Sequence, residues 1–203
     1  MSTQSPGLLR PGTILYFIRH GETDWNRDAR YQGQRDIPLN ATGRAQAKRH
    51  GDLLKSLLSD PTAVDFVSSP LGRASETMRI VRTALGLNPE AFATDDRIVE
   101  LSYGHWEGEL AAELPSKDPA GVAAKSLDPF HWRPIGGESY ADLEARISPW
   151  LGGIKKTTVA VSHGGVSRVA RGALYDLDRA TVPFLAVPQD QILELRSDNL
   201  RWL

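Results

Sequence analysis

Short apolar runs alternate along the chain with longer segments whose apolar residues recur at helical spacing. The run at 13–18 (TILYFI) is rich in residues that favour strands and lies between a glycine and a polar stretch, which is typical of a buried strand. The strands expected from such runs are 13–18, 63–67, 92–101, 157–161 and 192–195, of which 92–101 is the weakest. The helices expected from the longer segments are 40–59, 70–85, 139–150 and 165–174. Strands that alternate with helices predict an α/β fold, in which a mostly parallel central sheet is covered by helices on both faces.

Three of these helices begin with residues that suit a helix N-terminus. Asn40 opens the first of them. Ser69 is expected to cap the second, because its hydroxyl precedes a proline at the first helical position. Ser139 and Asp142 resemble a capping box, with Asp in place of the preferred Glu or Gln. If the helix expected at 70–85 begins after Ser69, Arg73 lies in its first turn.

Two segments depart from the alternation of strands and helices. Residues 1–12 have the composition of a loose tail ahead of the first strand. Residues 105–138 combine Pro, Gly, Trp and mixed charges without a regular period, which indicates a loop-rich insertion that covers one end of the sheet. Neither segment indicates a separate domain, and we expect a single domain over 1–203.

The composition is that of an ordinary globular protein. Of the 203 residues, 40% are hydrophobic and 24% are charged, and the formal net charge of −1 argues against a general nucleic-acid binder. The chain has no cysteine, so it can contain no disulfide, thiolate nucleophile or cysteine-ligated metal. No stretch approaches the ~18 apolar residues of a membrane span, and the first residues lack the apolar run of a signal peptide. We therefore expect a cytoplasmic protein that binds neither membrane nor nucleic acid.

The candidate chemistry lies where three of the expected strands end. The first strand runs into Arg19 and His20, Arg73 follows the second, and the strand at 157–161 runs into His163. The carboxyl ends of parallel strands meet at one edge of a sheet, where α/β proteins bind ligands. Two arginines, two histidines and two helix N-termini at that edge would form a pocket for a dianion, most simply a phosphate.

A histidine at the tip of a strand indicates more than phosphate binding. A neutral imidazole is a competent nucleophile toward phosphorus, and neighbouring cations favour its neutral form. The same cations stabilise the negative charge that the phosphoryl oxygens carry in the transition state. An alkoxide leaving group also needs a proton, for which Glu100 and Glu22 are the candidate acids.

Other chemistries fit these residues less well. Two histidines and a glutamate could ligate zinc, but two arginines in the same pocket would repel a divalent cation. Ser68 and Ser69 lack the Gly-x-Ser-x-Gly elbow of a serine hydrolase, and the chain has no Walker-type sequence for ATP. We therefore expect neither a metal nor an organic cofactor.

The polar motifs occur as ordered blocks between residue 13 and about residue 175. They are Arg19-His20-Gly21-Glu22-Thr23, Trp25-Asn26, Gln32-Gly33, Asp36-Ile37-Pro38-Leu39, Gly43-x-x-Gln46-Ala47, Ser68-Ser69-Pro70-Leu71-x-Arg73-Ala74-x-Glu76-Thr77, Glu100, Gly104-x-Trp106-Glu107-Gly108, Gly136-Gly137-Glu138-Ser139 and Ser162-His163-Gly164-Gly165. In this order they resemble the histidine phosphatase superfamily, also called the phosphoglycerate mutase-like family, and in particular its phosphatases. The dipeptide Arg–His alone would carry little weight, whereas the whole ordered set is not expected by chance.

The resemblance implies a fold and a role for most of the motifs. It implies a three-layer α/β sandwich and metal-free catalysis, with His20 as the phosphorylated nucleophile and Glu100 as the general acid. The residues that it implies for holding the phosphoryl oxygens or the substrate are Arg19, Arg73, His163, Asn26, Gln32, Gly33 and Gly164. The partner would be a small phosphorylated substrate, and the resemblance is compatible with a homodimer.

Three activities share these motifs: hydrolysis of a phosphate ester, phosphoryl transfer by a mutase, and silent binding of phosphate. Silent binding is disfavoured because every chemical position is filled. A mutase must hold a second anionic group of its substrate, and such enzymes carry a longer, basic insertion. Residues 109–135 contain the three basic residues Lys117, Lys125 and Arg133 and four acidic residues, so the insertion is short and not cationic. A phosphomonoesterase that resembles the histidine acid phosphatases is therefore favoured, with a mutase and a silent binding protein as the alternatives.

The motifs do not name the substrate. The insertion and the loop at 188–191 (PQDQ), which departs from the Asn that many relatives carry there, are expected to select it. His131 and Trp132 in the insertion could border the substrate, whereas His50 and His105 are expected to be structural or surface residues.

Overall fold

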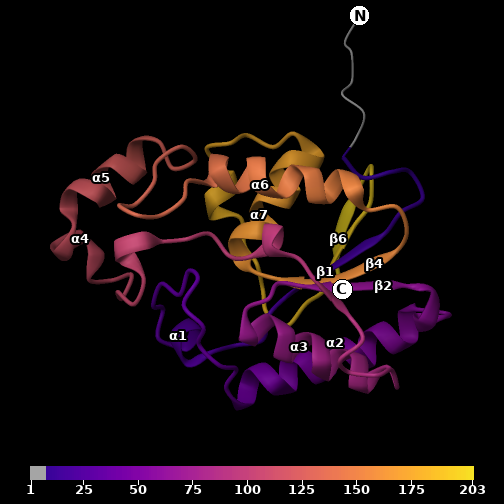
Figure 1. Cartoon of the computed structure of the whole chain (residues 1–203). Helices are drawn as coiled ribbons and strands as arrows, with labels where there is room; N and C mark the ends of the chain where they lie inside the picture. The colour runs from indigo at the N-terminus through magenta and orange to yellow at the C-terminus, as the bar shows by residue number, and fades with distance from the viewer. Residues whose placement is uncertain (1–7) are drawn as a thin grey trace, which may run out of the picture.

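The computed structural model describes residues 8–203, and a six-stranded sheet lies at its centre (Figure 1). The strand order is β3-β2-β4-β1-β5-β6. Strands β1 to β4 run parallel to one another, whereas β5 is antiparallel to both of its neighbours. The strands are β1 (Leu15–Arg19), β2 (Asp65–Ser68), β3 (Ala93–Thr94), β4 (Thr158–Ser162), β5 (Leu193–Leu195) and β6 (Leu200–Trp202). The predicted mostly parallel sheet is confirmed.

Helices cover both faces of the sheet, as predicted (Figure 1). The helices α2 (Ala41–Leu57) and α3 (Gly72–Ala84) lie below the sheet in this view. The helices α6 (Tyr140–Gly153) and α7 (Gly164–Tyr175) lie above it. The result is the three-layer α/β sandwich that the resemblance implies.

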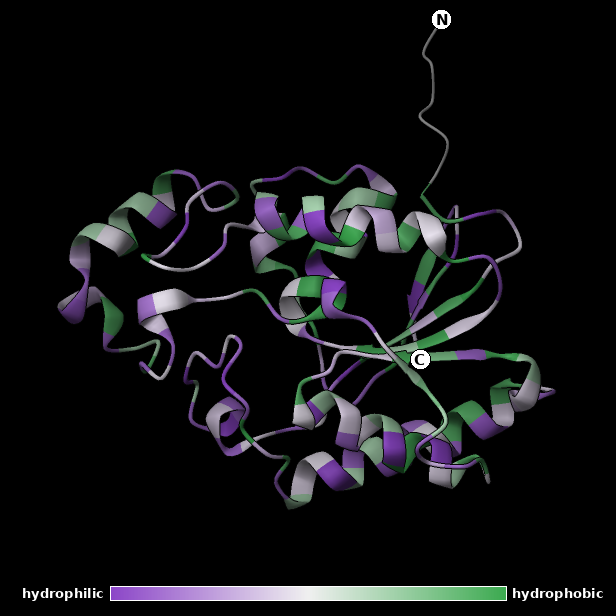
Figure 2. Ribbon diagram, viewed as in Figure 1, coloured by the Kyte–Doolittle hydropathy of each residue, from purple (hydrophilic) through white to green (hydrophobic). Residues whose placement is uncertain are grey.

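Burial on both faces explains why the central strand β1 is apolar throughout. Leu15 and Phe17 belong to the core shared with α6 and α7, while Tyr16 and Ile18 belong to the core shared with α2 and α3. Each fully buried side chain of this size contributes ~1.5–3 kcal/mol to folding. Figure 2 shows the outcome as largely hydrophobic central strands between helices that carry both hydrophobic and hydrophilic bands.

Two of the three predicted helix starts are confirmed and one is wrong. Asn40 caps α2, and Ser139 with Asp142 forms a complete capping box at the start of α6. Ser69, however, does not cap α3, which begins two residues later than predicted and has Leu71 at its cap position with no side-chain cap. The Ser69 hydroxyl lies 2.7 Å from a ring nitrogen of His163 instead, so it serves the site rather than the helix.

The insertion over 105–138 contains more regular structure than the sequence indicated. It includes α4 (Leu114–Lys117) and α5 (Pro119–Leu127), which lie beyond the end of the sheet (Figure 1). Asp118 caps α5 by accepting a hydrogen bond from the N–H of Gly121 at 2.9 Å, and Pro119 follows it at the first helical position. This cap is visible in the sequence and predicts a helix start that we did not assign.

The weak strand expected at 92–101 is confined to β3, which is followed by the 3-10 turn η2 (Asp96–Ile98). A last strand that the sequence did not indicate, β6, pairs with β5 at the sheet edge. The first seven residues of the expected tail lie outside the described part of the chain, whereas Leu9 is buried and Leu8 packs against the core of α6 and α7. Within residues 8–203, no helix combines the length and the apolar character needed to cross a bilayer.

Candidate active site

Two of the central strands deliver a histidine to the same edge of the sheet. His20 follows β1, and its main-chain N–H donates to the carbonyl of Ser162 at 2.9 Å. His163 follows β4 directly and precedes the first residue of α7. The two imidazole rings lie 5.1 Å apart between centroids. The convergence of strand ends expected from a parallel sheet therefore brings the two candidate histidines together.

One nitrogen of the His20 ring is anchored and the other faces a cation. Nδ1 lies 2.8 Å from the carbonyl oxygen of Gly21, so its N–H donates there. Nε2 then carries the lone pair and accepts a hydrogen bond from Nε of Arg73 at 3.2 Å. Gly21 is itself fixed, because its N–H donates to the Thr77 hydroxyl at 3.0 Å and any side chain on it would collide with the backbone of Gly43.

The His20 ring is neutral near physiological pH. Burial is the largest cause that holds its pKa well below the ordinary 6.5, and the charges of Arg73 and Arg19 lower this pKa further. A neutral ring with a fixed Nδ1–H presents the Nε2 lone pair, which is the form that a nucleophile needs.

Main-chain carbonyls hold Arg73 beside this lone pair. Its side chain is fully buried, and its two Nη atoms donate to the carbonyl of Arg35 at 2.6 Å and to that of Gly33 at 2.7 Å. Gly33 has a φ of +54°, and a side chain there would collide with Glu107. The loop therefore needs glycine at this point to present the carbonyl that orients the guanidinium.

Arg19 supplies a buried donor that has no partner among the described residues. Nη1 of Arg19 donates to the carbonyl of Val187 at 2.9 Å, whereas its buried Nε has no hydrogen-bond partner among residues 8–203. Gly164 is the first residue of α7, and a Cβ built on it would lie 3.7 Å from that Nε. A helix N-terminus beside a guanidinium favours an anion.

The two nitrogens of the His163 ring also differ in their hydrogen bonding. Its Nε2 lies 2.7 Å from the Ser69 hydroxyl, and Nδ1 is buried without a partner in the described structure. The Ser69 hydroxyl also accepts from the N–H of Leu71 at 3.4 Å. Burial is the largest cause that lowers the pKa of His163 well below its ordinary value, followed by the charge of Arg73, so the ring is neutral in the folded protein.

The two candidate acids occupy different places. Glu100 is buried, and its Oε1 accepts from the N–H of Leu101 at 2.9 Å and from the N–H of Gly165 at 3.0 Å. It therefore lies at the start of α7, next to the free donors. Glu22 accepts instead from the side chain of Asn40 at 2.9 Å, at the cap of α2. Of the two, the structure places Glu100 with the histidines of the two strand ends.

Asn26 and Gln32 belong to one polar network behind His20. The Asn26 Oδ1 accepts from the Thr23 N–H at 3.2 Å and from Nε2 of Gln189 at 3.1 Å. Gln32 accepts from the Thr23 hydroxyl at 2.8 Å, so its carbonyl oxygen faces the protein. The same Gln189 nitrogen donates to the carbonyl of His20 at 2.9 Å. The loop at 188–191 is thus hydrogen-bonded, through Gln189, to the backbone of the candidate nucleophile.

Comparison with known proteins agrees with this geometry. The sequence pattern of the histidine phosphatase superfamily (branch 1) matches residues 15–203. The chain belongs to the histidine phosphatase superfamily. It is 34% identical to phosphoserine phosphatase 1 of Hydrogenobacter thermophilus over 169 residues, which cover 81% of this chain and 77% of that protein. The predicted family, and with it a hydrolase of the histidine phosphatase type, is confirmed.

Solved structures of the superfamily share the fold as well as the sequence. The mycobacterial glucosyl-3-phosphoglycerate phosphatase in complex with VO3 superposes with a TM-score of 0.78 at 30% identity, covering 94% of this chain and 97% of that one. Mutases are also similar: the 2,3-bisphosphoglycerate-dependent phosphoglycerate mutase 2 of Gloeobacter violaceus is 32% identical over 173 residues, 81% of this chain and 75% of that protein.

Three residues of this histidine phosphatase site were not predicted from sequence. Gln189 was noted only as a departure from the Asn of many relatives, and Ser69 was assigned to a helix cap. Arg168 lies one helical turn into α7, where its Nε donates to the carbonyl of Leu185 at 2.8 Å and its Nη1 approaches Gly164. Its spacing of four residues from Gly164 is the signal that could have identified it, since residues four apart lie on the same face of a helix.

Two helix N-termini were predicted at this edge of the sheet, and that of α7 lies beside Arg19. At the start of α3, a Cβ built on Gly72 would lie 2.8 Å from Oδ2 of Asp36, so a carboxylate of the chain itself already lies against this helix end. Within residues 8–203, no three His, Cys, Asp or Glu side chains gather as a metal site would require.

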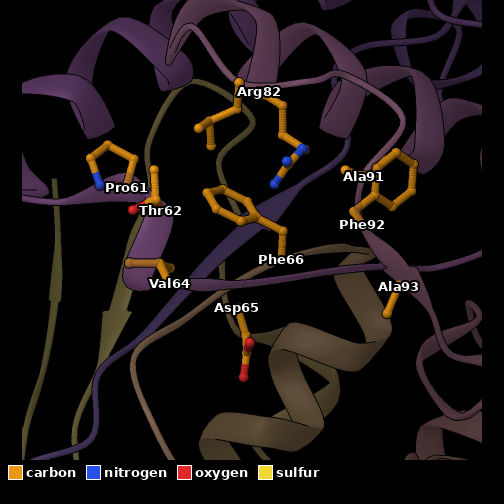
Figure 3. Close-up of a pocket in the computed structure, with 10 residues that line it drawn as sticks. Pro61, Thr62, Val64, Asp65, Phe66, Arg82, Ala91, Phe92 and Ala93 are labelled. Atoms are coloured by element: carbon orange, nitrogen blue, oxygen red, sulfur yellow. The ribbon is translucent and has the colours of Figure 1, made fainter.

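A recess of about 580 Å3 lies away from the candidate site residues (Figure 3). It is formed where β2 begins rather than where it ends, beneath the 3-10 turn η1 (Pro61–Ala63). In Figure 3 the Arg82 guanidinium lies over the Phe66 ring, at 4.5 Å from its centroid. None of the candidate site residues lines this recess. His131 lies apart from the site too, exposed and 3.1 Å from Asp128.

The three buried histidines should make the stability of this histidine phosphatase depend on pH. Burial is the largest cause that lowers the pKa of His20, His50 and His163. The unfolded chain therefore takes up protons below about pH 6.5 that the folded chain does not, and the free energy of unfolding falls as the pH falls. Each such histidine contributes up to about 1.4 kcal/mol per pH unit. We expect the urea midpoint to decrease from pH 7 to pH 5.

A His50→Gln variant is the control for this prediction. It removes one of the three groups, so its urea midpoint should depend less steeply on pH than that of the wild type. A wild-type midpoint that stays constant between pH 7 and pH 5 would contradict the assignment of neutral buried histidines.

Proposed function

We propose that the protein is a phosphomonoesterase that transfers the phosphoryl group of a small phosphorylated metabolite to Nε2 of His20 and then to water. The observation that carries this proposal is the state of His20: neutral, with Nδ1–H fixed and its Nε2 lone pair beside Arg73. A histidine that only bound phosphate would need a proton on the nitrogen that faces it, which this arrangement disfavours.

In the first step, Nε2 of His20 attacks phosphorus and forms a P–N bond as the bond from phosphorus to the ester oxygen breaks. The ester oxygen leaves with the electron pair and takes a proton from Glu100. In the second step, water attacks phosphorus and gives its proton to Glu100, and the P–N bond breaks. The products are the alcohol and inorganic phosphate, and His20 and Glu100 return to their initial forms.

The donors that lack protein partners match the oxygens of a phosphoryl group. Arg19 Nε and Nδ1 of His163 are buried without a partner among residues 8–203, and the start of α7 lies beside them. Arg73 Nε, which now donates to His20, can donate to phosphoryl oxygen once the lone pair of His20 is engaged with phosphorus. Charge-assisted donors of this kind stabilise the transition state without rearranging.

Oε1 of Glu100 accepts from both main-chain N–H groups, whereas Oε2 receives only the longer contact of 3.3 Å from Gly165. We therefore assign proton transfer to Oε2, the carboxylate oxygen that the main chain engages less.

The insertion supports hydrolysis over a mutase reaction. Two of its cations are neutralised within the chain: Lys117 lies 2.8 Å from Glu113, and Arg133 lies 2.7 Å from Asp142. A mutase must retain a second strongly anionic group through both transfers, and this insertion offers it few free cations. The curated relatives include both kinds of enzyme, and those named for phosphoserine and glucosyl-3-phosphoglycerate favour an organic phosphate ester as substrate.

Trapping the phosphoenzyme tests the proposal. Protein mixed with a 32P-labelled phosphate ester and quenched in alkali should carry label that is lost in acid, because a P–N bond is labile in acid and stable in base. The label should be absent from a His20→Ala variant treated in the same way. Label that survives acid would indicate a phosphoserine or similar ester and would refute His20 as the nucleophile.

We also propose that the reaction needs no metal, because Arg19, Arg73 and α7 already supply the positive charge. The rate on an aryl phosphate should be unchanged after incubation with a strong chelator and removal of the chelated ions. A large loss that added zinc or magnesium restores would contradict this part of the proposal while leaving the phosphoenzyme test unaffected.

A further inference from the structure

The main chain at 185–189 is held in place by side chains from β1, α2 and α7. Four of its carbonyl oxygens accept hydrogen bonds of 2.8 or 2.9 Å from these side chains. The pairs are Leu185 with Arg168, Ala186 with Arg171, Val187 with Arg19 and Gln189 with Nε2 of His50. The backbone from which the Gln189 side chain extends is therefore fixed without any contribution from that side chain.

The Gln189 side chain uses both of its amide hydrogens. Its Nε2 donates to the main-chain carbonyl of His20 at 2.9 Å and to Oδ1 of Asn26 at 3.1 Å. Oδ1 of Asn26 also accepts from the main-chain N–H of Thr23 at 3.2 Å, which identifies that atom as the oxygen of the amide. A reversed Gln189 amide would set its own oxygen against two acceptors, so only one orientation is compatible with these neighbours.

The group that Gln189 holds is the peptide between His20 and Gly21. The carbonyl of this peptide accepts from Gln189, and its N–H donates to the Thr77 hydroxyl at 3.0 Å. A trans peptide is planar, and its oxygen and its hydrogen point in opposite directions. The two hydrogen bonds therefore fix the orientation of the peptide plane from both sides.

This peptide plane determines where the His20 ring points. The next carbonyl along the chain is that of Gly21, which accepts from Nδ1 of His20 at 2.8 Å. As long as that carbonyl stays in place, Nδ1 keeps the proton and Nε2 keeps the lone pair. Without Gln189 the peptide would be held only through its N–H, so it could tilt, weaken the hydrogen bond to Nδ1 and allow the other tautomer.

We propose that Gln189 is a positioning residue for phosphoryl transfer to His20. It holds the peptide between His20 and Gly21 in the orientation that directs the Nε2 lone pair at phosphorus, and His50 anchors the main chain from which it extends. The inference rests on the proposed function and adds to it a residue that acts through His20 rather than on the substrate.

Gln189→Met tests the proposal, because methionine keeps the unbranched shape of glutamine but has no side-chain hydrogen to donate. We expect kcat/KM for p-nitrophenyl phosphate, which reports the phosphorylation of His20, to fall about 10- to 100-fold, the cost of a misdirected reacting group. The inhibition constant of inorganic phosphate should change by less than about threefold, since Arg19, Arg73 and His163 keep their contacts. Gln189→Glu, which presents oxygen to both acceptors, should lose at least as much activity.

The tautomer of His20 gives a second readout, which a role in stability alone would not change. The chain has five histidines, so 15N spectra of protein labelled at histidine are simple, and the His20 signals are those missing from His20→Ala. The wild type should show His20 as one tautomer with Nδ1 protonated. Gln189→Met should show His20 as a mixture of two tautomers, with the signals of His163 unchanged.

His50 acts one step further from the reaction. His50→Leu removes the donor to the Gln189 carbonyl and should lower kcat/KM in the same direction but to a smaller extent. His50→Gln can still donate from its amide and should retain most of the wild-type rate. In a Gln189→Met background His50→Leu should have little further effect, because residues that act through one contact are not additive.

Arg171→Met is the matched control, because it also removes a side chain that holds the main chain at 185–189 but has no hydrogen bond that leads to His20. A thermal melt must show that each variant is folded. The control should keep the wild-type kcat/KM, and a loss equal to that of Gln189→Met would assign the effect to loosening of the whole segment and overturn the role of Gln189.

Two other results would overturn this role. One is an unchanged kcat/KM and His20 tautomer in folded Gln189→Met. The other is a loss in kcat/KM that is matched by the inhibition constant of phosphate, which would make Gln189 a ligand of the substrate. Both would leave the phosphoenzyme intact. Failure of the wild type to form an acid-labile phosphoenzyme would instead overturn the proposed function itself.

Discussion

Replacing His20 with alanine is expected to reduce turnover of p-nitrophenyl phosphate by about 10⁴-fold or more, because the variant has no nitrogen on which the phosphoryl group can be carried. The donors around the phosphate remain, so binding of inorganic phosphate as a competitive inhibitor should persist. A steady-state assay with long incubation, together with an inhibitor titration where residual activity allows, measures both quantities.

The fold should tolerate this change. The His20 ring contributes a local hydrogen bond to Gly21 and accepts one from Arg73, but the β1 positions that build the core lie before it. Removal of a buried ring leaves a polar cavity at the ligand edge, which water can occupy. Circular dichroism and a thermal melt should therefore match those of the wild type within a few degrees.

His131→Ala is the matched control, since it removes an exposed histidine that pairs with Asp128 on the surface. Its activity should equal that of the wild type. A folded His20→Ala variant that retains more than a small fraction of wild-type turnover would show that the phosphoryl group is carried elsewhere or passes directly to water.

The strand ends of this site were predictable because one rule fixes them. In a parallel sheet the polar residue after each buried strand must lie at the same edge, so Arg19, His20 and His163 could be placed from hydropathy alone. Arg73 follows for the same reason, through a short turn after β2. These four residues do meet, and their burial accounts for the neutral histidines.

The supporting residues were not predictable in this way because their partners are far apart in the sequence. Gln189 reaches the carbonyl of His20 across 169 positions, and Nε2 of His50 donates to the carbonyl of Gln189 at 2.9 Å across 139 positions. Ser69 has the local pattern of a helix cap, and only the approach of His163 shows its other use. Local propensity decides such positions when no stronger tertiary partner is present.

The assignment of Glu100 leads to a prediction that depends on the leaving group. An alkyl ester needs its oxygen protonated as the P–O bond breaks, whereas a nitrophenol leaves readily as the anion. Glu100→Gln is therefore expected to slow an alkyl phosphate by about 10²–10⁴-fold and p-nitrophenyl phosphate much less. The substitution is conservative in structure, because a glutamine carbonyl can replace Oε1 as the acceptor of the N–H groups of Leu101 and Gly165.

Arg73→Ala is the contrasting variant. It removes a guanidinium whose charge stabilises the phosphoryl oxygens whatever the leaving group is, so both esters should be slowed to a similar extent. It also frees the carbonyls of Gly33 and Arg35, so a thermal melt must show that the variant is folded before its rates are compared. The informative quantity is the ratio of the two ester rates, which a general loss of folded protein does not change.

Glu22→Gln completes the comparison, since Glu22 is the other carboxylate that the sequence allowed and the structure places it on Asn40. Its ratio of alkyl to aryl rates should equal that of the wild type, while that of Glu100→Gln falls. If Glu100→Gln slowed both esters equally, its carboxylate would act in orienting the start of α7 through Gly165 rather than in proton transfer. If Glu22→Gln showed the selective loss instead, the carboxylate at the cap of α2 would have to move toward the leaving group when substrate binds, and the assignment of Glu100 as the acid would be wrong.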